Sequence, residues 1–187
     1  LDENCDKYGR LYSWKEAKDA CPAGWHLPSS AEWDALWYGY IESAGSVMKS
    51  KVGWLNDGNV DGNGVDRFGF AALPAGEWVS STGGFEELGR YANFWSSTPY
   101  DANGAYFVSM FYENKYAEIL PDYFGTNGYS VRCIKTEEVT VDSTGCESTD
   151  LWCKNTSRDN NYRVNTGVDA GGATSGFWWD TYDNADG

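Results

Sequence analysis

An oxygen-rich loop over residues 57–66 carries the ligand types that Ca²⁺ prefers. Carboxylate and amide side chains recur there at every second position, and a glycine follows where the chain must turn, as in the first half of a calcium-binding loop. The twelfth position is Phe68 instead of the bidentate glutamate of an EF-hand, so we expect a smaller site completed by a late carboxylate. The predicted calcium ligands are Asp57, Asn59, Asp61, Asn63 and Asp66. The alternative is a turn whose side chains bond only to nearby backbone.

Aromatic side chains are the second group with binding chemistry, since they make up 17% of the 187 residues. An exposed ring can stack on the face of a sugar, and aromatic residues are enriched at binding surfaces in general. Four aromatic residues fall in loop-like sequence and are the predicted ligand-binding residues: Trp54, Trp78, Tyr100 and Tyr123. The alternative for each of these rings is packing in the core.

Catalytic chemistry finds little support in the chain. His26 is the single histidine, and as a general base it would need a nucleophile and an orienting acid beside it. Sequence spacing places no such group near it, and a histidine hydrogen-bonded to backbone is the simpler interpretation. We therefore expect a protein without enzymatic activity.

The charge balance limits the possible partners. Fourteen basic and 28 acidic residues give a formal charge of −14, with a sequence pI of about 4.3. Nucleic-acid binding requires clustered Lys and Arg, so nucleic acid is excluded, and an anionic membrane surface is disfavoured. Because no apolar run reaches the roughly 18–20 residues of a membrane helix, we expect no direct membrane insertion. Neutral glycans and proteins remain as partners, and the oligomeric state is left open.

Two helices and a set of short strands must position these residues. Ser13 with Glu16 and Ser29 with Glu32 have the spacing of capping boxes, which predicts helices starting near residues 14 and 30. We expect the second helix to run to a C-cap at Gly45. Strands are predicted near 94–97, 105–112, 115–120 and 128–135, so the fold class is α+β.

The chain changes character after residue 135. Residues 136–147 are polar and acidic and are predicted to form a linker, and residues 148–187 are predicted to be the truncated start of a β-rich module. Cys146 and Cys153 have a spacing that suits a disulfide. The five cysteines contain no C-x-x-C pair and fit an oxidising, extracellular setting. The odd number means that one cysteine is free or has its partner outside this chain.

Four ordered segments resemble a known family. Residues 8–36, 66–76, 94–100 and 128–135 are similar to the Fibrobacter succinogenes major paralogous domain, a module of secreted and surface proteins, over about residues 1–135. The resemblance implies a C-type lectin-like fold, in which two helices pack on a twisted, mostly antiparallel sheet, followed here by a short β-rich C-terminal appendix. It also implies core positions for Trp25, Trp33 and Trp95.

The same resemblance implies a pairing for the cysteines of the domain. Cys21, at the end of the first helix, would form a disulfide with Cys133 in the last strand. Cys5 would have its partner upstream, outside this chain.

The resemblance implies no reaction. We therefore expect a non-catalytic extracellular or cell-surface binding module that adheres to plant polysaccharide or another surface component, with Ca²⁺ as a candidate cofactor. The alternative is a structural module that assembles a cell-surface protein complex. A sugar site would show a polar aromatic surface, whereas a protein interface would show a contiguous apolar patch.

Overall fold

Short helices precede short antiparallel strands in the computed structural model, which describes residues 3–136. This arrangement confirms the α+β class. The elements are α1 (Glu3–Tyr8), α2 (Trp14–Ala17), β1 (Trp25–His26), α3 (Ser30–Leu36), the 3₁₀ helix η1 (Ile41–Ser43), α4 (Ala44–Met48), β2 (Glu77–Val79), β3 (Gly84–Glu86), β4 (Tyr91–Pro99), β5 (Ala105–Phe111), β6 (Ala117–Asp122) and β7 (Ile134–Lys135). No helix in this described part of the chain is long and apolar enough to cross a membrane.

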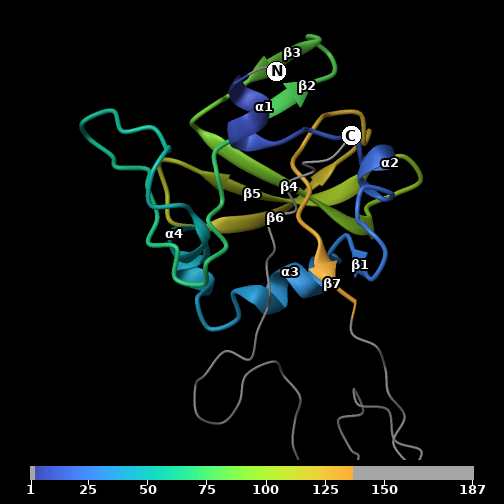
Figure 1. Ribbon diagram of the computed structural model, residues 1–187, viewed down its shortest axis with the longest axis horizontal. Helices are drawn as coiled ribbons and strands as arrows, with labels where there is room; N and C mark the ends of the chain where they lie inside the picture. The colour runs from blue at the N-terminus through green and yellow to red at the C-terminus, as the bar shows by residue number, and fades with distance from the viewer. Residues whose placement is uncertain (1–2, 137–187) are drawn as a thin grey trace, which may run out of the picture. The chain divides into compact units, whose positions relative to one another are not determined.

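The central sheet has the antiparallel order β4-β5-β6, and two further pairs, β1-β7 and β2-β3, lie outside it (Figure 1). Two segments extend the free edge of β4. Ser130 lies parallel to Phe94 and donates its amide to the carbonyl of Asn93, and Gly76, just before β2, lies parallel to Ala92. The edge of β4 therefore holds both the β2–β3 hairpin and the last segment of the domain.

The helix starts follow their capping residues. The carboxylate of Glu16 accepts bonds from the amide and hydroxyl of Ser13, and Glu32 repeats both bonds with Ser29. The hydroxyl of Ser29 also accepts the amide of Glu32, at 3.2 Å. These bonds satisfy donors that the first helical turn leaves unpaired, so both predicted starts are confirmed.

The predicted end of the second helix is wrong. The helix α3 ends at Leu36, because Gly39 has a φ of +90° that no α-helix accommodates. Gly45 lies inside the separate helix α4 and is not a C-cap. A Cβ on Gly45 would approach the carbonyl oxygen of Tyr116 to 2.2 Å, so this glycine allows α4 to approach the segment before β6.

Hydrophobic residues pack on both faces of the sheet. Successive residues of β4 point to opposite faces: Phe94 packs with Trp33 of α3, and Trp95 packs with Tyr129. Trp33 and Trp95 are fully buried, which confirms their predicted core positions, and Trp25 is half-buried.

A disulfide joins Cys21 to Cys133 with an S–S distance of 2.07 Å and closes a separation of 112 residues, as the resemblance implied. Closing so long a loop contributes about 4–5 kcal/mol in the chain-entropy description. Cys5 is a free, exposed cysteine. The predicted Cys146–Cys153 disulfide and the module at 148–187 lie outside the described residues, as does the linker except for Thr136.

Candidate functional site

Three tyrosines gather at one end of the central sheet. Tyr100 directly follows β4, Tyr106 lies on β5, and Tyr123 directly follows β6. The ring centroid of Tyr100 lies 5.1 Å from that of Tyr123 and 5.5 Å from that of Tyr106, both edge to face. Tyr100 and Tyr123 are 41% and 55% exposed, so both rings remain open to a ligand. We call these three residues the tyrosine platform.

Strand register explains why these rings meet. Pro99 pairs with Ala105, and Tyr106 pairs with Pro121, so the end of β4, the start of β5 and the end of β6 lie side by side. Antiparallel neighbours at this spacing bring side chains into contact across strands. The sequence does not mark Tyr106 as a candidate ligand-binding residue, because it falls within the alternating pattern of a strand, which indicates sheet packing.

Two aspartates fix the loops that carry the platform. Asp101 accepts the amides of Asn103 and Gly104 through Oδ1, both at 2.8 Å, which also holds the pKa of Asp101 low. On the other loop, Asp122 is buried and accepts the amides of Phe124 and Gly125. Because these bonds constrain the backbone next to Tyr100 and Tyr123, the two rings are held in place before a ligand arrives.

The remaining acceptor capacity of Asp122 is also used. Its Oδ2 accepts a bond from Nδ2 of Asn127 at 2.8 Å and from the hydroxyl of Tyr129 at 3.0 Å. Burial, followed by the charge of Asp122, raises the pKa of Tyr129 well above its usual value, so this phenol is a neutral donor at physiological pH. The network is thus a rigid support beneath the loop that carries Tyr123.

The phenols of the platform are suited to neutral, hydroxyl-rich ligands. The neighbouring phenol of Tyr123 is the largest cause of a raised pKa at Tyr100, which therefore stays protonated at physiological pH. A neutral phenol both donates and accepts hydrogen bonds, and its ring supplies an apolar face. Phe124, which is 75% exposed, adds a further ring beside Tyr123 in sequence.

The other two predicted aromatic ligands lie elsewhere. The prediction for Trp54 is wrong, because its ring is only 5% exposed and its indole N–H donates to the carbonyl of Ala72 inside the core. Trp78 is half-buried on β2 and exchanges backbone hydrogen bonds with Gly128. No ring contact joins Trp78 to the tyrosine platform within residues 3–136.

The predicted calcium loop uses its oxygens on its own backbone. Oδ1 of Asp57 accepts the amides of Asn59 and Val60, both at 2.9 Å, and these bonds lower the pKa of Asp57. Oδ1 of Asp61 accepts both the backbone amide and the side-chain Nδ2 of Asn63. These bonds match the alternative of a side-chain-stabilised turn.

The last two predicted ligands point to different partners. Oδ1 of Asn63 accepts the amide of Trp54 at 3.2 Å, whereas Oδ1 of Asp66 accepts the amide of Ala71 at 2.8 Å. The charge of Asp66 acts on Arg132, far along the chain. Within residues 3–136, no group of three or more His, Cys, Asp and Glu side chains is placed to hold a metal. Calcium binding by this loop stays a prediction.

A buried lysine lies beside the oxygen-rich loop, and no pattern in the sequence indicates its burial. Lys49 is only 2% exposed, and its ammonium donates to the carbonyls of Phe111 and Asn114 at 3.1 and 2.8 Å. Burial lowers the pKa of Lys49 to about 8, and the charge of Asp61 partly opposes this change. The ammonium also lies 4.8 Å from the ring centroid of Trp54, so the loop already has a positive group next to it.

The single histidine is held by an acid. Nε2 of His26 lies 2.9 Å from Oε1 of Glu32, whose Oε2 accepts the amide of Ser29. Burial raises the pKa of Glu32, but the hydrogen bonds from Ser29 and His26 outweigh it, so the pKa is lowered overall. These bonds give His26 and Glu32 a role at the start of α3.

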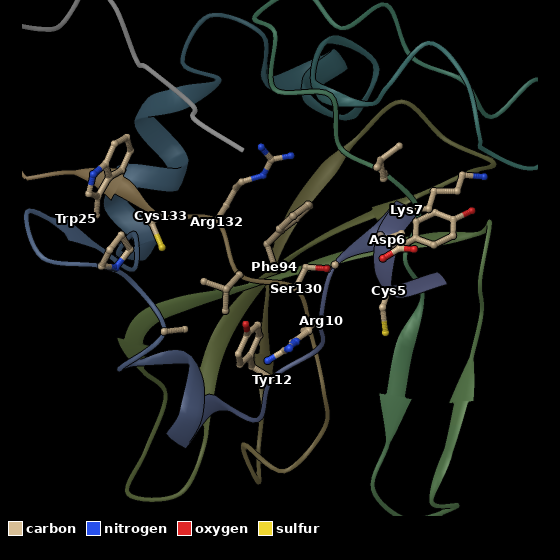
Figure 2. Close-up of a pocket in the computed structure, with 16 residues that line it drawn as sticks. Cys5, Asp6, Lys7, Arg10, Tyr12, Trp25, Phe94, Ser130, Arg132 and Cys133 are labelled. Carbon is tan, nitrogen blue, oxygen red and sulfur yellow. The ribbon is translucent and has the colours of Figure 1, made fainter. Parts of the chain in front are cut away.

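A groove of about 450 Å³ runs between the N-terminal segment and the last segment of the domain (Figure 2). Cys5 and Cys133 lie toward opposite ends of the labelled wall, with Phe94 and Ser130 between them. Cys133 is closed in its disulfide with Cys21, so the Cys5 thiol is the free sulfur of the groove.

The fold and the site together define an α+β domain. It is closed by a disulfide across 112 residues and carries an exposed tyrosine platform. Residues 1–135 match the family model described as the Fibrobacter succinogenes major domain. The chain therefore belongs to this family. Neither the curated proteins nor the solved structures give a significant match.

Proposed function

We propose that this domain is a non-catalytic module that binds neutral polysaccharide through the tyrosine platform. The observation that carries the proposal is the placement of Tyr100 and Tyr123, two exposed rings whose centroids lie 5.1 Å apart in loops fixed by buried or turn-forming aspartates. Rings held in advance lose little conformational entropy when a sugar stacks on them. Their hydroxyls supply hydrogen bonds at the edge of the same surface.

A C-type lectin-like fold is part of this proposal. Support comes from the helix α3 packed on the central sheet and from the disulfide that joins the region after α2 to the last segment of the domain. The proposed location is extracellular or at the cell surface, since a structural disulfide such as Cys21–Cys133 forms and persists in oxidising compartments. In this proposal, Ca²⁺ remains a candidate cofactor of the oxygen-rich loop.

Charge favours a neutral ligand. The chain has a net charge of −14, and Asp101 and Asp122 flank the platform in sequence. A polyanion would meet repulsion here, and a nucleic acid would lack the basic contacts that it requires. Neutral plant polysaccharides such as cellulose and xylan are therefore the ligands to test.

The test is retention of the full chain on insoluble cellulose and xylan, with calcium and with EDTA. We expect the double variant Tyr100→Ala/Tyr123→Ala to lose at least about tenfold in affinity, because stacking of a nucleobase on one aromatic ring contributes about 1–3 kcal/mol and a sugar that loses two rings should lose at least the lower figure. Tyr38→Ala is the matched control, because Tyr38 is 81% exposed and does not belong to the platform. Equal retention of all three proteins, or no retention of the wild type, would contradict the proposal.

A second candidate function is assembly with a surface protein. It rests on the β2–β3 hairpin, where Phe85 is 80% exposed and Leu88 in the following turn is 49% exposed. Contiguous exposed apolar side chains are typical of protein interfaces, and these two lie three positions apart in the sequence. If Phe85→Asp prevented incorporation into a surface complex while the platform variant did not, assembly would replace polysaccharide binding as the main function.

A further inference from the structure

The rings of the tyrosine platform are not coplanar. The ring planes of Tyr100 and Tyr123 meet at 86°, and those of Tyr100 and Tyr106 meet at 84°. Tyr100 therefore stands nearly perpendicular to both of its neighbours. Because Tyr100 and Tyr123 are the two exposed members of the platform, a ligand meets a corner formed by two rings.

A flat surface fits only one ring of such a pair. A sugar stacks on an aromatic ring with the two faces parallel, because this arrangement removes the most apolar surface from water. In crystalline cellulose the chains lie side by side, and the sugar faces at the crystal surface are parallel to one another. Two rings at 86° cannot both lie against that surface, so the second ring meets it only by its edge.

An isolated glycan chain can contact both rings at once. Each of its sugars has a face of C–H groups and an edge of hydroxyls, and both are open when no other chain lies alongside. One ring of the perpendicular pair then stacks on the face of a sugar, while the other ring lies along its edge. The centroids of Tyr100 and Tyr123 are 5.1 Å apart, which keeps both contacts within the span of one sugar unit.

We propose that the tyrosine platform selects isolated glycan chains, such as xylan and the loose chains of swollen cellulose, over the flat surface of crystalline cellulose. This selectivity rests on the proposed polysaccharide function and specifies the class of ligand for the same site. In a crystal, neighbouring chains occupy the sugar edge that the second ring must reach. In an isolated chain that edge is free.

Packing around Tyr100 holds the rings at this angle. Tyr106 is half-buried on β5 and contacts the ring of Tyr100 edge to face at 5.5 Å between centroids. If Tyr100 turned flat against a surface, it would lose its edge-to-face contacts with both Tyr106 and Tyr123, which stabilise beyond the area that they bury. Asp101 and Asp122 also fix the backbone beside the two exposed rings. Tyr106 is thus a positioning residue for the corner.

The experiment compares two physical forms of one polymer. Binding isotherms of the full 187-residue chain are measured on microcrystalline and on acid-swollen cellulose, and binding to soluble xylan is measured by affinity electrophoresis. We expect the chain to bind swollen cellulose at least about fivefold more tightly than microcrystalline cellulose. The flat surface gives up one of two ring contacts, and a single stacking contact between a nucleobase and an aromatic ring is worth about fivefold or more.

Two variants of Tyr106 test whether the ring angle causes the selectivity. Tyr106→Ala removes the ring that holds Tyr100 and should bring the affinities for the two forms of cellulose close to equality. Tyr106→Phe is the matched control, because it keeps the ring and should keep the ratio of affinities, whatever it loses with the hydroxyl. If Tyr106→Ala does not fold, Tyr100→Ala decides, since the remaining Tyr123 ring can lie flat on either form and should show no preference.

Each result has a separate meaning. Equal or tighter binding of the wild type to microcrystalline cellulose overturns the proposed selectivity and leaves polysaccharide binding in place. An unchanged ratio in both Tyr106→Ala and Tyr100→Ala also overturns it, because the corner would then not be its source. A wild-type chain that binds none of the three polysaccharides overturns the proposed function and the selectivity together.

Discussion

The oxygen-rich loop and the β2–β3 hairpin both carry several acidic residues, but they differ in hydrogen-bond balance. In the loop, Asp57 and Asp61 each accept two N–H donors from residues just downstream. In the hairpin, Glu77 and Glu86 face each other across two strands, and beside it Oδ1 of the buried Asn93 has no hydrogen-bond donor among residues 3–136. Residue type and spacing alone thus do not tell whether an acidic segment has its oxygens satisfied, since that depends on which donors the folded chain brings to them.

The strongest way to break this comparison is to disturb the backbone of the loop. A Cβ on Gly64 would lie 2.2 Å from the carbonyl oxygen of Lys49, so Gly64→Ala must displace backbone and should lower the free energy of unfolding by about 3 kcal/mol. Gly58→Ala is the control, because a Cβ there meets nothing within 4 Å and only its φ of +87° opposes the change. Urea unfolding measures both losses.

If calcium restored the stability of Gly64→Ala, an ion and not the chain's own packing would organise the loop, and the contrast with the β2–β3 hairpin would fail. We expect no restoration, because the ammonium of Lys49 already lies beside Asp61.

The pH dependence of the free energy of unfolding tests whether burial lowers the pKa of the Lys49 ammonium. The pKa of Lys49 is about 8 in the folded protein and about 10.4 in an unfolded chain. Between these values the unfolded state binds more protons, so stability must rise with pH. From pH 8 to 9.5 we expect a gain of about 1.5 kcal/mol in the free energy of unfolding. Lys49→Met should lack the gain, and a parallel rise in this variant would assign it to other groups.

The smallest expected effect has opposite signs in the two regions. Asn63→Ala should destabilise the protein by about 1 kcal/mol in EDTA, because Asn63 bonds to both Trp54 and Asp61. Glu77→Gln should stabilise it by about 0.5 kcal/mol at pH 7, a figure reduced for the solvent screening of a half-exposed carboxylate.

The sign for Glu77 follows from its raised pKa. Ionised Glu77 destabilises the folded state above that pKa, and the difference between wild type and Glu77→Gln should disappear as the pH falls to about 4. Thermal or urea unfolding from pH 4 to 7 measures the difference. A loss of stability in Glu77→Gln at pH 7 would mean that the carboxylate already has a positive partner.

Local signals made part of the fold predictable. Ser13 and Ser29 cap their helices as expected, since a capping box depends on residues three positions apart. The prediction for Gly45 is wrong because its small size is needed for contact with Tyr116, 71 residues downstream, and not for a helix end. The sequence carries no local trace of such a distant contact.

The candidate site was likewise predictable only in part. Tyr100 and Tyr123 were predicted from their loop-like context, but their closeness depends on the register of β4, β5 and β6. Trp54 was misjudged because a Gly- and Asn-rich neighbourhood concealed a buried ring. The sequence gives no signal for Asn93, because an amide in a strand becomes notable only when its burial and the absence of a donor for its Oδ1 among residues 3–136 are known.

The Cys21–Cys133 disulfide also decides how this domain responds to mechanical load. When tension pulls on the chain from both sides, force entering at Cys21 passes through the S–S bond to Cys133 and bypasses the intervening segment. The tyrosine platform and the β2–β3 hairpin both belong to that bypassed segment. Both regions would thus stay unstretched while the flanking chain carries the load.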